Sequence, residues 1–166
     1  SGVEDATISG AGHLICFTGT DTIPSIDFLE RYYNADCEKE LIGGSVPATE
    51  HSVMCMGTKD NEIETFERLI TKIYPSGIVS IVSDTWDFWQ VITEFLPKLK
   101  DKILAREGKV VIRPDSGDPV KIIVGDPNAP VGSPEYKGAI ECMWETFGGV
   151  TTDKGFKLLD PHIGLI

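Results

Sequence analysis

Positive charge is scarce in this sequence of 166 residues. Lys and Arg number 15 against 26 Asp and Glu, which gives a formal net charge of −11. Nucleic acids and anionic membrane surfaces bind basic patches, so this composition argues against both as general partners. A small phosphorylated substrate remains compatible with it, because a few local cations and backbone N–H groups are enough to hold a phosphate.

Long apolar runs and paired cysteine motifs are also missing. The uninterrupted apolar stretches are far shorter than the roughly 20 residues that a transmembrane helix needs. Four cysteines occur, none of them in a C-x-x-C pair, and they are Cys16, Cys37, Cys55 and Cys142. With no signal peptide in view, we expect reduced thiols in a cytoplasmic protein and no structural zinc.

Both ends of the sequence look cut. Residues 1–5 carry no start signal, and residues 162–166 stop inside a segment that has the composition of a new strand. A domain that ends within a strand cannot close its sheet, so we expect an internal fragment of a longer protein. Its hydrophobic content of 41% is sufficient for a core.

Apolar runs typical of strands alternate with amphipathic stretches typical of helices. We expect strands over residues 13–17, 42–46, 77–82 and 109–112. Between them we expect a helix capped by Thr22 with Pro24 in its first turn, a helix over 63–73, and a helix from Thr85. Crossovers of this length are typical of βαβ units. The sequence therefore predicts an α/β fold, as part of a parallel (β/α) barrel.

Residues 117–155 interrupt this alternation. They contain four prolines, a helical pattern over residues 136–147, and then Gly148 and Gly149. We interpret this stretch as a loop and helix insertion within one catalytic domain that covers residues 1–166. The next strand is expected near residues 156–159.

A short polar cluster follows each of the expected strands. In a parallel barrel the loops after the carboxyl ends of the strands converge on one face, where catalytic groups gather. This arrangement predicts an enzyme, with a site built from Asp21, Glu50, His51, Asp84, Arg113 and Asp115.

The segment Arg-Pro-Asp-Ser-Gly-Asp at 113–118 is the sharpest of these signals. A guanidinium binds phosphate oxygens in pairs, and the carboxylate of Asp115 could accept hydrogen bonds from two sugar hydroxyls. The alternative is a turn at a strand end in which Arg113 and an aspartate form a structural ion pair, which Pro114 would also suit.

His51 follows Glu50 directly, and Asp84 ends a neighbouring strand. A histidine with carboxylates nearby suits a general base, a metal ligand or a phosphoryl acceptor. The alternative is a half-buried histidine that makes a single hydrogen bond. Asp21 and Asp84 each precede an expected helix, so both have an alternative role as helix caps.

Four segments together resemble the nicotinamide phosphoribosyltransferase family, which belongs to the type II phosphoribosyltransferases. They lie at residues 17–22 (FTGTDT), 45–52 (SVPATEHS), 82–84 (VSD) and 111–117 (VIRPDSG). They occur in the family's order and at about its spacings. The segment at 154–159 (KGFKLL) is similar to the one that leads into the family's next barrel strand. Only the stretch around 119–150 is less familiar.

This resemblance implies a reaction, in which nicotinamide and phosphoribosyl pyrophosphate give nicotinamide mononucleotide and pyrophosphate for NAD biosynthesis. It also implies Mg²⁺ bound with the pyrophosphate, ATP as a coupled substrate, and a homodimer with shared active sites. The family's ring-stacking residues and phosphate loops would lie outside these 166 residues. The isolated fragment would then be inactive.

The resemblance assigns substrate contacts to five residues. Asp21 would accept a hydrogen bond from the carboxamide of nicotinamide, while Ser45 and Ser80 would face the ligand tunnel. Arg113 would bind the phosphoribosyl group, and Asp115 would bind the ribose hydroxyls.

It assigns catalysis to three others. His51 would be the histidine that ATP phosphorylates, and Glu50 and Asp84 would orient its ring.

Three other functions remain open at this point. A nicotinate phosphoribosyltransferase has the same fold, but Asp21 would repel the carboxylate of nicotinate. A barrel piece without catalytic activity is a second alternative. The third is a metal hydrolase that uses His51 with Asp21 and Asp84.

Overall fold

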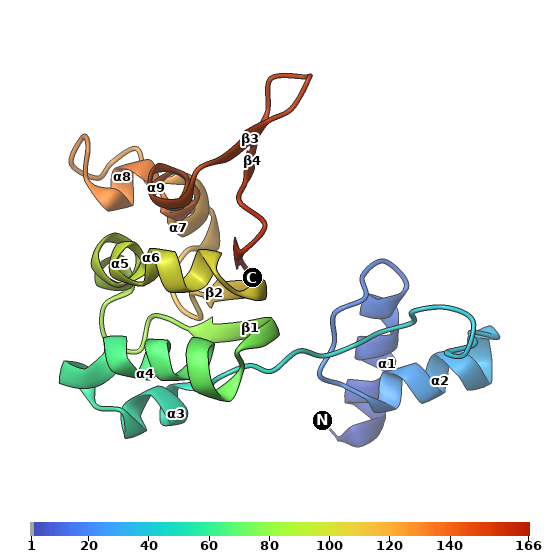
Figure 1. The fold of residues 1–166 in the computed structure, drawn as a ribbon. Coiled ribbons are helices and arrows are strands. Elements are labelled where there is room, and N and C mark those ends of the chain that lie inside the picture. Colours follow the sequence, from blue (N-terminus) through green and yellow to red (C-terminus); the bar gives the residue numbers. More distant parts are fainter. Residues whose placement is uncertain (1) are drawn as a thin grey trace. The chain divides into compact units, whose positions relative to one another are not determined.

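The computed structural model describes residues 2–166, which divide into two compact units between Val46 and Pro47 (Figure 1). Each unit has its own hydrophobic core. Within the described residues, no helix combines the length and the apolar composition that crossing a bilayer requires.

Two helices form most of the first unit. They are α1 (Val3–Leu14) and α2 (Pro24–Tyr33). Pro24 stands in the first turn of α2 as expected, where a missing N–H leaves no helical bond unmade. The core of the unit consists of Ala11, Leu14, Leu29 and Ile42.

The prediction of two strands in the first unit, at residues 13–17 and 42–46, is wrong. Residues 13 and 14 close α1 instead, because Ala11 and Leu14 share one face of a helix and are buried with Leu29 of α2. The expected strand at 42–46 is reduced to one parallel bridge, between Gly44 and Gly19. Glycines at 43 and 44 offer no side chains to pack on a sheet, which weakens a strand there.

The expected cap of α2 is also wrong. The N-cap residue is Ile23, and no side chain caps this end of the helix. The backbone N–H of Thr22 instead donates to the hydroxyl of Thr20, which makes a tight turn before the helix.

The second unit is built on a parallel sheet with the strand order β1-β2-β5. These strands are β1 (Ser76–Val82), β2 (Glu107–Arg113) and β5 (Ile163–Leu165). Val110 of the central strand lies opposite Val79 on one side and Ile163 on the other. The prediction of an α/β fold with a parallel sheet is confirmed, and the closed barrel stays a prediction.

Helices precede β1 and connect it to β2. Those before β1 are α3 (His51–Met56), η1 (Lys59–Asn61), α4 (Glu62–Arg68) and the π-helical turn η2 (Leu69–Ile73). Those after it are α5 (Phe88–Gln90), the π-helical turn η3 (Val91–Phe95) and α6 (Leu96–Leu104). The helix expected over 63–73 is confirmed, and its fully buried residues include Phe66 and Ile70.

The helix expected from Thr85 begins three residues later, at Phe88. Its N-cap is Asp87, whose carboxylate accepts a hydrogen bond of 3.0 Å from the N–H of Gln90. The alternative role of Asp84 as the cap of this helix is therefore wrong. The helix takes the wider π-helical form at η3, just before Pro97. We attribute this to the proline, which lacks the N–H that an α-helix would direct at the carbonyl of Thr93.

The stretch 117–155 holds more regular structure than the sequence predicted. Asp118 caps a helix that was not expected, α7 (Pro119–Val124). The helix expected over 136–147 is two helices, α8 (Pro134–Lys137) and α9 (Ala139–Phe147). They break at Gly138, whose φ of 83° disfavours any other residue.

The strand expected near 156–159 is β4 (Lys157–Leu159), but it does not join the parallel sheet. It pairs antiparallel with β3 (Gly149–Thr151), and Figure 1 shows the two as a hairpin that extends from α9. The next parallel strand of the main sheet is β5, as the strand-like end of the sequence indicated.

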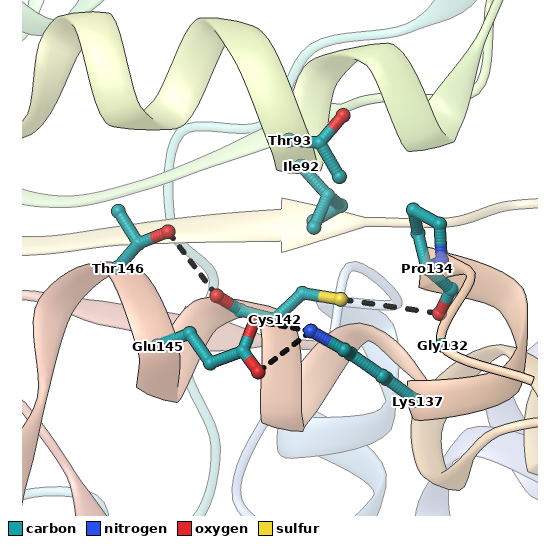
Figure 2. A pocket seen from close by; sticks show the side chains of 8 residues that line it. All are labelled: Ile92, Thr93, Gly132, Pro134, Lys137, Cys142, Glu145 and Thr146. Carbon is teal, nitrogen blue, oxygen red and sulfur yellow. Dashed lines mark hydrogen bonds and ion pairs between the residues drawn. The ribbon is translucent and has the colours of Figure 1, made fainter.

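A small hollow of about 150 Å³ lies between η3 and the helices α8 and α9 (Figure 2). Lys137 and Glu145 form an ion pair of 2.7 Å at its wall. Cys142 is buried there, and burial raises the pKa of its thiol. The lining residues are Ile92, Thr93, Gly132, Pro134, Lys137, Cys142, Glu145 and Thr146.

Candidate active site

Residues 47–49 run beside β1 and deliver the first site residues to its carboxyl end. A parallel bridge joins Ala48 to Ser80 of β1, and the N–H of Thr49 donates to the carbonyl of Ser80 at 3.0 Å. The buried hydroxyl of Thr49 accepts from the N–H of Val82 at 3.0 Å. This pairing places Glu50, and then His51 at the start of α3, where β1 ends.

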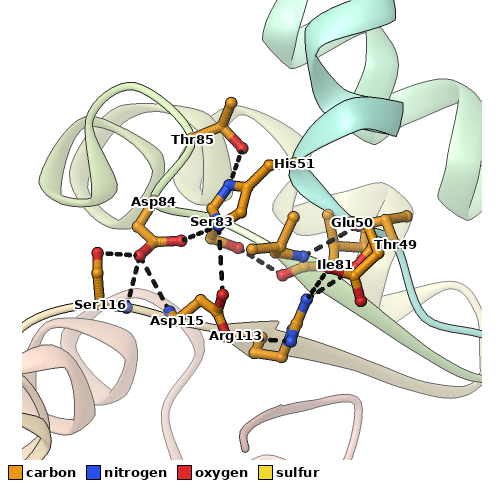
Figure 3. Close-up of polar contacts among 11 residues, drawn as sticks. Thr49, Glu50, His51, Ile81, Ser83, Asp84, Thr85, Arg113, Asp115 and Ser116 are labelled. Carbon is orange, nitrogen blue, oxygen red and sulfur yellow. Dashed lines mark hydrogen bonds and ion pairs between the residues drawn. The ribbon is translucent and has the colours of Figure 1, made fainter.

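His51 lies between a hydroxyl and two carboxylates (Figure 3). Its Nδ1 is 3.0 Å from Oγ1 of Thr85. Its Nε2 is 3.3 Å from Oδ2 of Asp115 and 3.9 Å from Oδ1 of Asp84. The side chain is 43% exposed, so the ring can be reached from solvent while both nitrogens are oriented by the protein.

Asp84 anchors the loop that follows β2. Its Oδ2 accepts hydrogen bonds from the N–H of Asp115 at 3.0 Å, the N–H of Ser116 at 2.8 Å and the hydroxyl of Ser116. Burial by itself raises the pKa of this carboxyl, but the hydrogen bonds from Ser116 and Asp115 outweigh it and hold the pKa below its ordinary value. Asp84 is therefore a carboxylate at neutral pH, and its side chain is only 8% exposed.

Arg113 ends β2 and contacts both neighbouring acids. Its Nη1 is 3.1 Å from Asp115 and its Nη2 is 3.3 Å from Glu50. Nη2 also donates to the carbonyl of Thr49 at 3.0 Å, which fixes the guanidinium beside the start of α3. The ion pair of the structural alternative is thus present, and it lies within the same cluster as His51.

Five buried side-chain nitrogen and oxygen atoms have no hydrogen-bond partner within residues 2–166. Oε1 of Glu62 and Nε of Arg106 lie outside the candidate site, and the other three are Oγ of Ser80, Oδ1 of Asp84 and Nε of Arg113. A buried polar group without a partner is costly, and such groups are frequent where a ligand or water completes the bonding. All three atoms of the site belong to residues that the sequence singled out.

Asp21 and Ser45 form a pair of their own within the first unit. The hydroxyl of Ser45 donates to Oδ1 of Asp21, and both side chains are exposed. Two backbone bonds between Gly44 and residues 18 and 20 hold the segments of this pair together. Whether the pair joins the cluster at the end of β1 stays a prediction.

Residues 2–166 match the model of the nicotinate phosphoribosyltransferase (NAPRTase) family. The chain belongs to this family. The resemblance found in the sequence is confirmed by this match, and the family places the chain among the phosphoribosyltransferases, which are pentosyltransferase enzymes.

Similar proteins carry a consistent description. A nicotinamide phosphoribosyltransferase of Acinetobacter baylyi is 59% identical over the whole chain, which covers 34% of that protein. Proteins of the same description from Mycoplasma pneumoniae and Xanthomonas campestris are 33% and 32% identical, again over the whole chain, which covers 34% and 32% of them. The chain thus spans about a third of the length of these curated relatives.

The structure adds two site residues that the sequence did not predict, Thr85 and Ser116. Thr85 was interpreted as the start of a helix, and the signal that was missed is Asp87, a strong N-cap residue directly before the helical run. Ser116 lay inside a recognised segment without a role. Ser116 follows β2 and contacts Asp84, which follows β1. Contacts between residues so far apart in the sequence leave no local pattern in it.

The side chain of Glu50 does not lie against the ring of His51, where the resemblance placed it. Its carboxylate lies against Arg113, whereas Thr85, Asp115 and Asp84 surround the ring of His51. The metal hydrolase alternative gains no support from geometry. In the part of the chain that the structure describes, no group of three or more His, Cys, Asp and Glu side chains is arranged to hold a metal ion.

Proposed function

We propose that the whole protein is a nicotinamide phosphoribosyltransferase with a barrel-like catalytic domain, working in NAD biosynthesis. The observation that carries the proposal is His51, held between Thr85 and two carboxylates next to Arg113. Such a site suits phosphoryl transfer to a histidine beside a phosphate-binding arginine. The descriptions of the similar proteins support nicotinamide as the substrate.

The carboxylates around His51 favour one tautomer of its neutral ring. Nε2 faces Asp115 and Asp84, so the N–H lies there, and the lone pair lies on Nδ1. Nδ1 is then the nucleophile that attacks the γ-phosphorus of ATP. The N–P bond forms as the P–O bond to ADP breaks, and the positive charge that develops on the ring faces the two carboxylates.

Arg113 is the proposed contact for the phosphoribosyl group. Without ligand its guanidinium is paired with Asp115 and with Glu50, whose side chain is 66% exposed. Because the Glu50 side of this ion pair is largely exposed and solvent screens it, a substrate phosphate can replace Glu50 at small cost. Asp115 would accept hydrogen bonds from the ribose hydroxyls, and its negative charge would stabilise an oxocarbenium-like transition state.

The pair of Asp21 and Ser45 is the proposed contact for nicotinamide. The hydroxyl of Ser45 donates to one oxygen of Asp21 and so fixes the carboxylate. The carboxylate can then accept from the N–H₂ of the carboxamide. Nicotinate would present a like charge to it.

Mg²⁺ with the pyrophosphate completes the proposal. This ion is usually held by one or two carboxylates together with phosphate oxygens and water. The partly exposed carboxylates of Glu50 and Asp115 fit that donor set. When bound, Mg²⁺ would neutralise the charge of the leaving pyrophosphate.

A cytoplasmic homodimer with shared active sites is part of the same proposal.

Replacing His51 by alanine tests the role of the histidine. In the whole protein we expect ATP to accelerate nicotinamide mononucleotide synthesis by the parent, and the ratio of the rates with and without ATP to fall to about one in the variant, since no residue takes the phosphoryl group. The measurement is the initial rate with nicotinamide, phosphoribosyl pyrophosphate and Mg²⁺. Equal ATP stimulation of parent and H51A would show that His51 has no such role.

A further inference from the structure

Thr85 contacts the imidazole of His51 on the side away from the carboxylates (Figure 3). It lies in the connection between β1 and α5, one residue after Asp84, and is partly buried. Its Oγ1 is 3.0 Å from Nδ1 of His51, which is a hydrogen-bond distance. The proposed function leaves this contact without a role.

We propose that Thr85 is a positioning residue that selects the reactive orientation of the His51 ring. The inference rests on the proposed function, because it takes His51 as the phosphoryl acceptor. With the N–H on Nε2 facing Asp115, the hydroxyl of Thr85 donates to the lone pair of Nδ1. A flip of the ring about its Cβ–Cγ bond would exchange Nδ1 for a carbon that cannot accept this bond. The flipped orientation is therefore disfavoured.

Three other hydroxyl groups of the cluster, those of Ser116, Ser83 and Thr49, are engaged elsewhere. Ser116 donates to Asp84, and Ser83 donates to the carbonyl of Ile81 at 2.7 Å. The hydroxyl of Thr49 accepts from the N–H of Val82. In the described part of the chain, the hydroxyl that contacts Nδ1 belongs to Thr85. No other hydroxyl there is placed to take over this contact if Thr85 is replaced.

Phosphoryl transfer changes what the hydroxyl meets. The lone pair of Nδ1 that accepts the hydrogen bond from Thr85 is the one that attacks phosphorus, so the hydroxyl must turn away from Nδ1 as the γ-phosphate approaches and the N–P bond forms. The hydroxyl then faces the place of the new phosphoryl group and can donate to one of its oxygens. Thr85 thus orients the nucleophile before the transfer and contacts the product of the transfer after it.

The test compares T85V with T85S in the whole protein. Valine keeps the branched shape of threonine but has no hydroxyl, while serine keeps the hydroxyl and loses the methyl group. We expect T85V to incorporate the γ-phosphoryl group of ATP into His51 roughly tenfold more slowly than the parent, which corresponds to one hydrogen bond. T85S should stay close to the parent rate. T93V, at an exposed threonine on η3, is the matched control and should not change the rate.

Two outcomes of this assay overturn the proposal. One is T85V at the parent rate, and the other is T85S as slow as T85V, since the hydroxyl is present in T85S. The ¹⁵N resonances of the His51 ring supply a second readout that does not depend on ATP. We expect the Nδ1 signal to move in T85V and to stay in place in T85S.

This second readout separates the two proposals. If the parent protein takes no phosphoryl group from ATP, the ATP coupling of the proposed function fails, and the ¹⁵N signals alone decide the role of Thr85. An Nδ1 signal that is the same in the parent and in T85V then overturns it.

Discussion

Replacing Asp21 by serine is expected to lower kcat/KM for nicotinamide by roughly one to two orders of magnitude. A hydrogen bond to a charged group contributes about 1.5–3 kcal/mol, and about 1.4 kcal/mol corresponds to a factor of ten. Serine has no carboxylate, so the substitution removes the charged acceptor that Ser45 holds in place. Use of nicotinate should be equal or better, because the like charge of Asp21 is gone.

The control for this change is D27S. Asp27 is exposed on α2 of the same unit, so the substitution removes one negative charge without touching the pair. Initial rates with nicotinamide and with nicotinate give both kcat/KM values for the parent and for each variant. If D21S leaves their ratio unchanged, Asp21 does not select the base.

Replacing Arg106 by methionine is expected to lower the free energy of unfolding by about 3 kcal/mol. Arg106 is only 6% exposed, and its guanidinium donates to the carbonyls of Ile70, Tyr74 and Gly77. The carbonyls of Ile70 and Tyr74 lie at the end of the helix before β1, and the carbonyl of Gly77 lies at the start of β1. Methionine keeps much of the buried stem but leaves the carbonyls without their donor.

Urea unfolding of the parent and of R106M measures this loss. K102M is the control, since Lys102 forms an ion pair with Glu67 in which both side chains are nearly half exposed, and such a pair contributes at most about 1 kcal/mol. Equal losses in R106M and K102M would mean that the buried bonds of Arg106 do not hold the start of β1.

The strands of the second unit could be predicted from the sequence because burial and local composition agree there. The β-branched run that ends at Val82 is buried in the sheet, and so is Val110 to Ile112. In the first unit an apolar run led to a wrong prediction of a strand, because a buried apolar residue such as Leu14 suits a helix as well as a strand. Short apolar runs do not distinguish the two without their tertiary partners.

The residue types of the site could be predicted, but not all of their contacts. The order of the segments gave His51, Asp84, Arg113 and Asp115, and the structure brings all four together. That Asp84 anchors the loop at Ser116 depends on the register between β1 and β2. Register is a long-range property, and no local pattern in either segment states it.

The central claim is that the whole protein attaches phosphoribosyl groups to nicotinamide, and product analysis tests it most directly. The whole protein is given phosphoribosyl pyrophosphate, Mg²⁺ and ATP with equal amounts of nicotinamide and nicotinate, and the mononucleotides are separated and quantified. We expect nicotinamide mononucleotide and pyrophosphate in equal amounts, with little nicotinate mononucleotide. Nicotinate mononucleotide as the main product, or neither mononucleotide, would contradict the account.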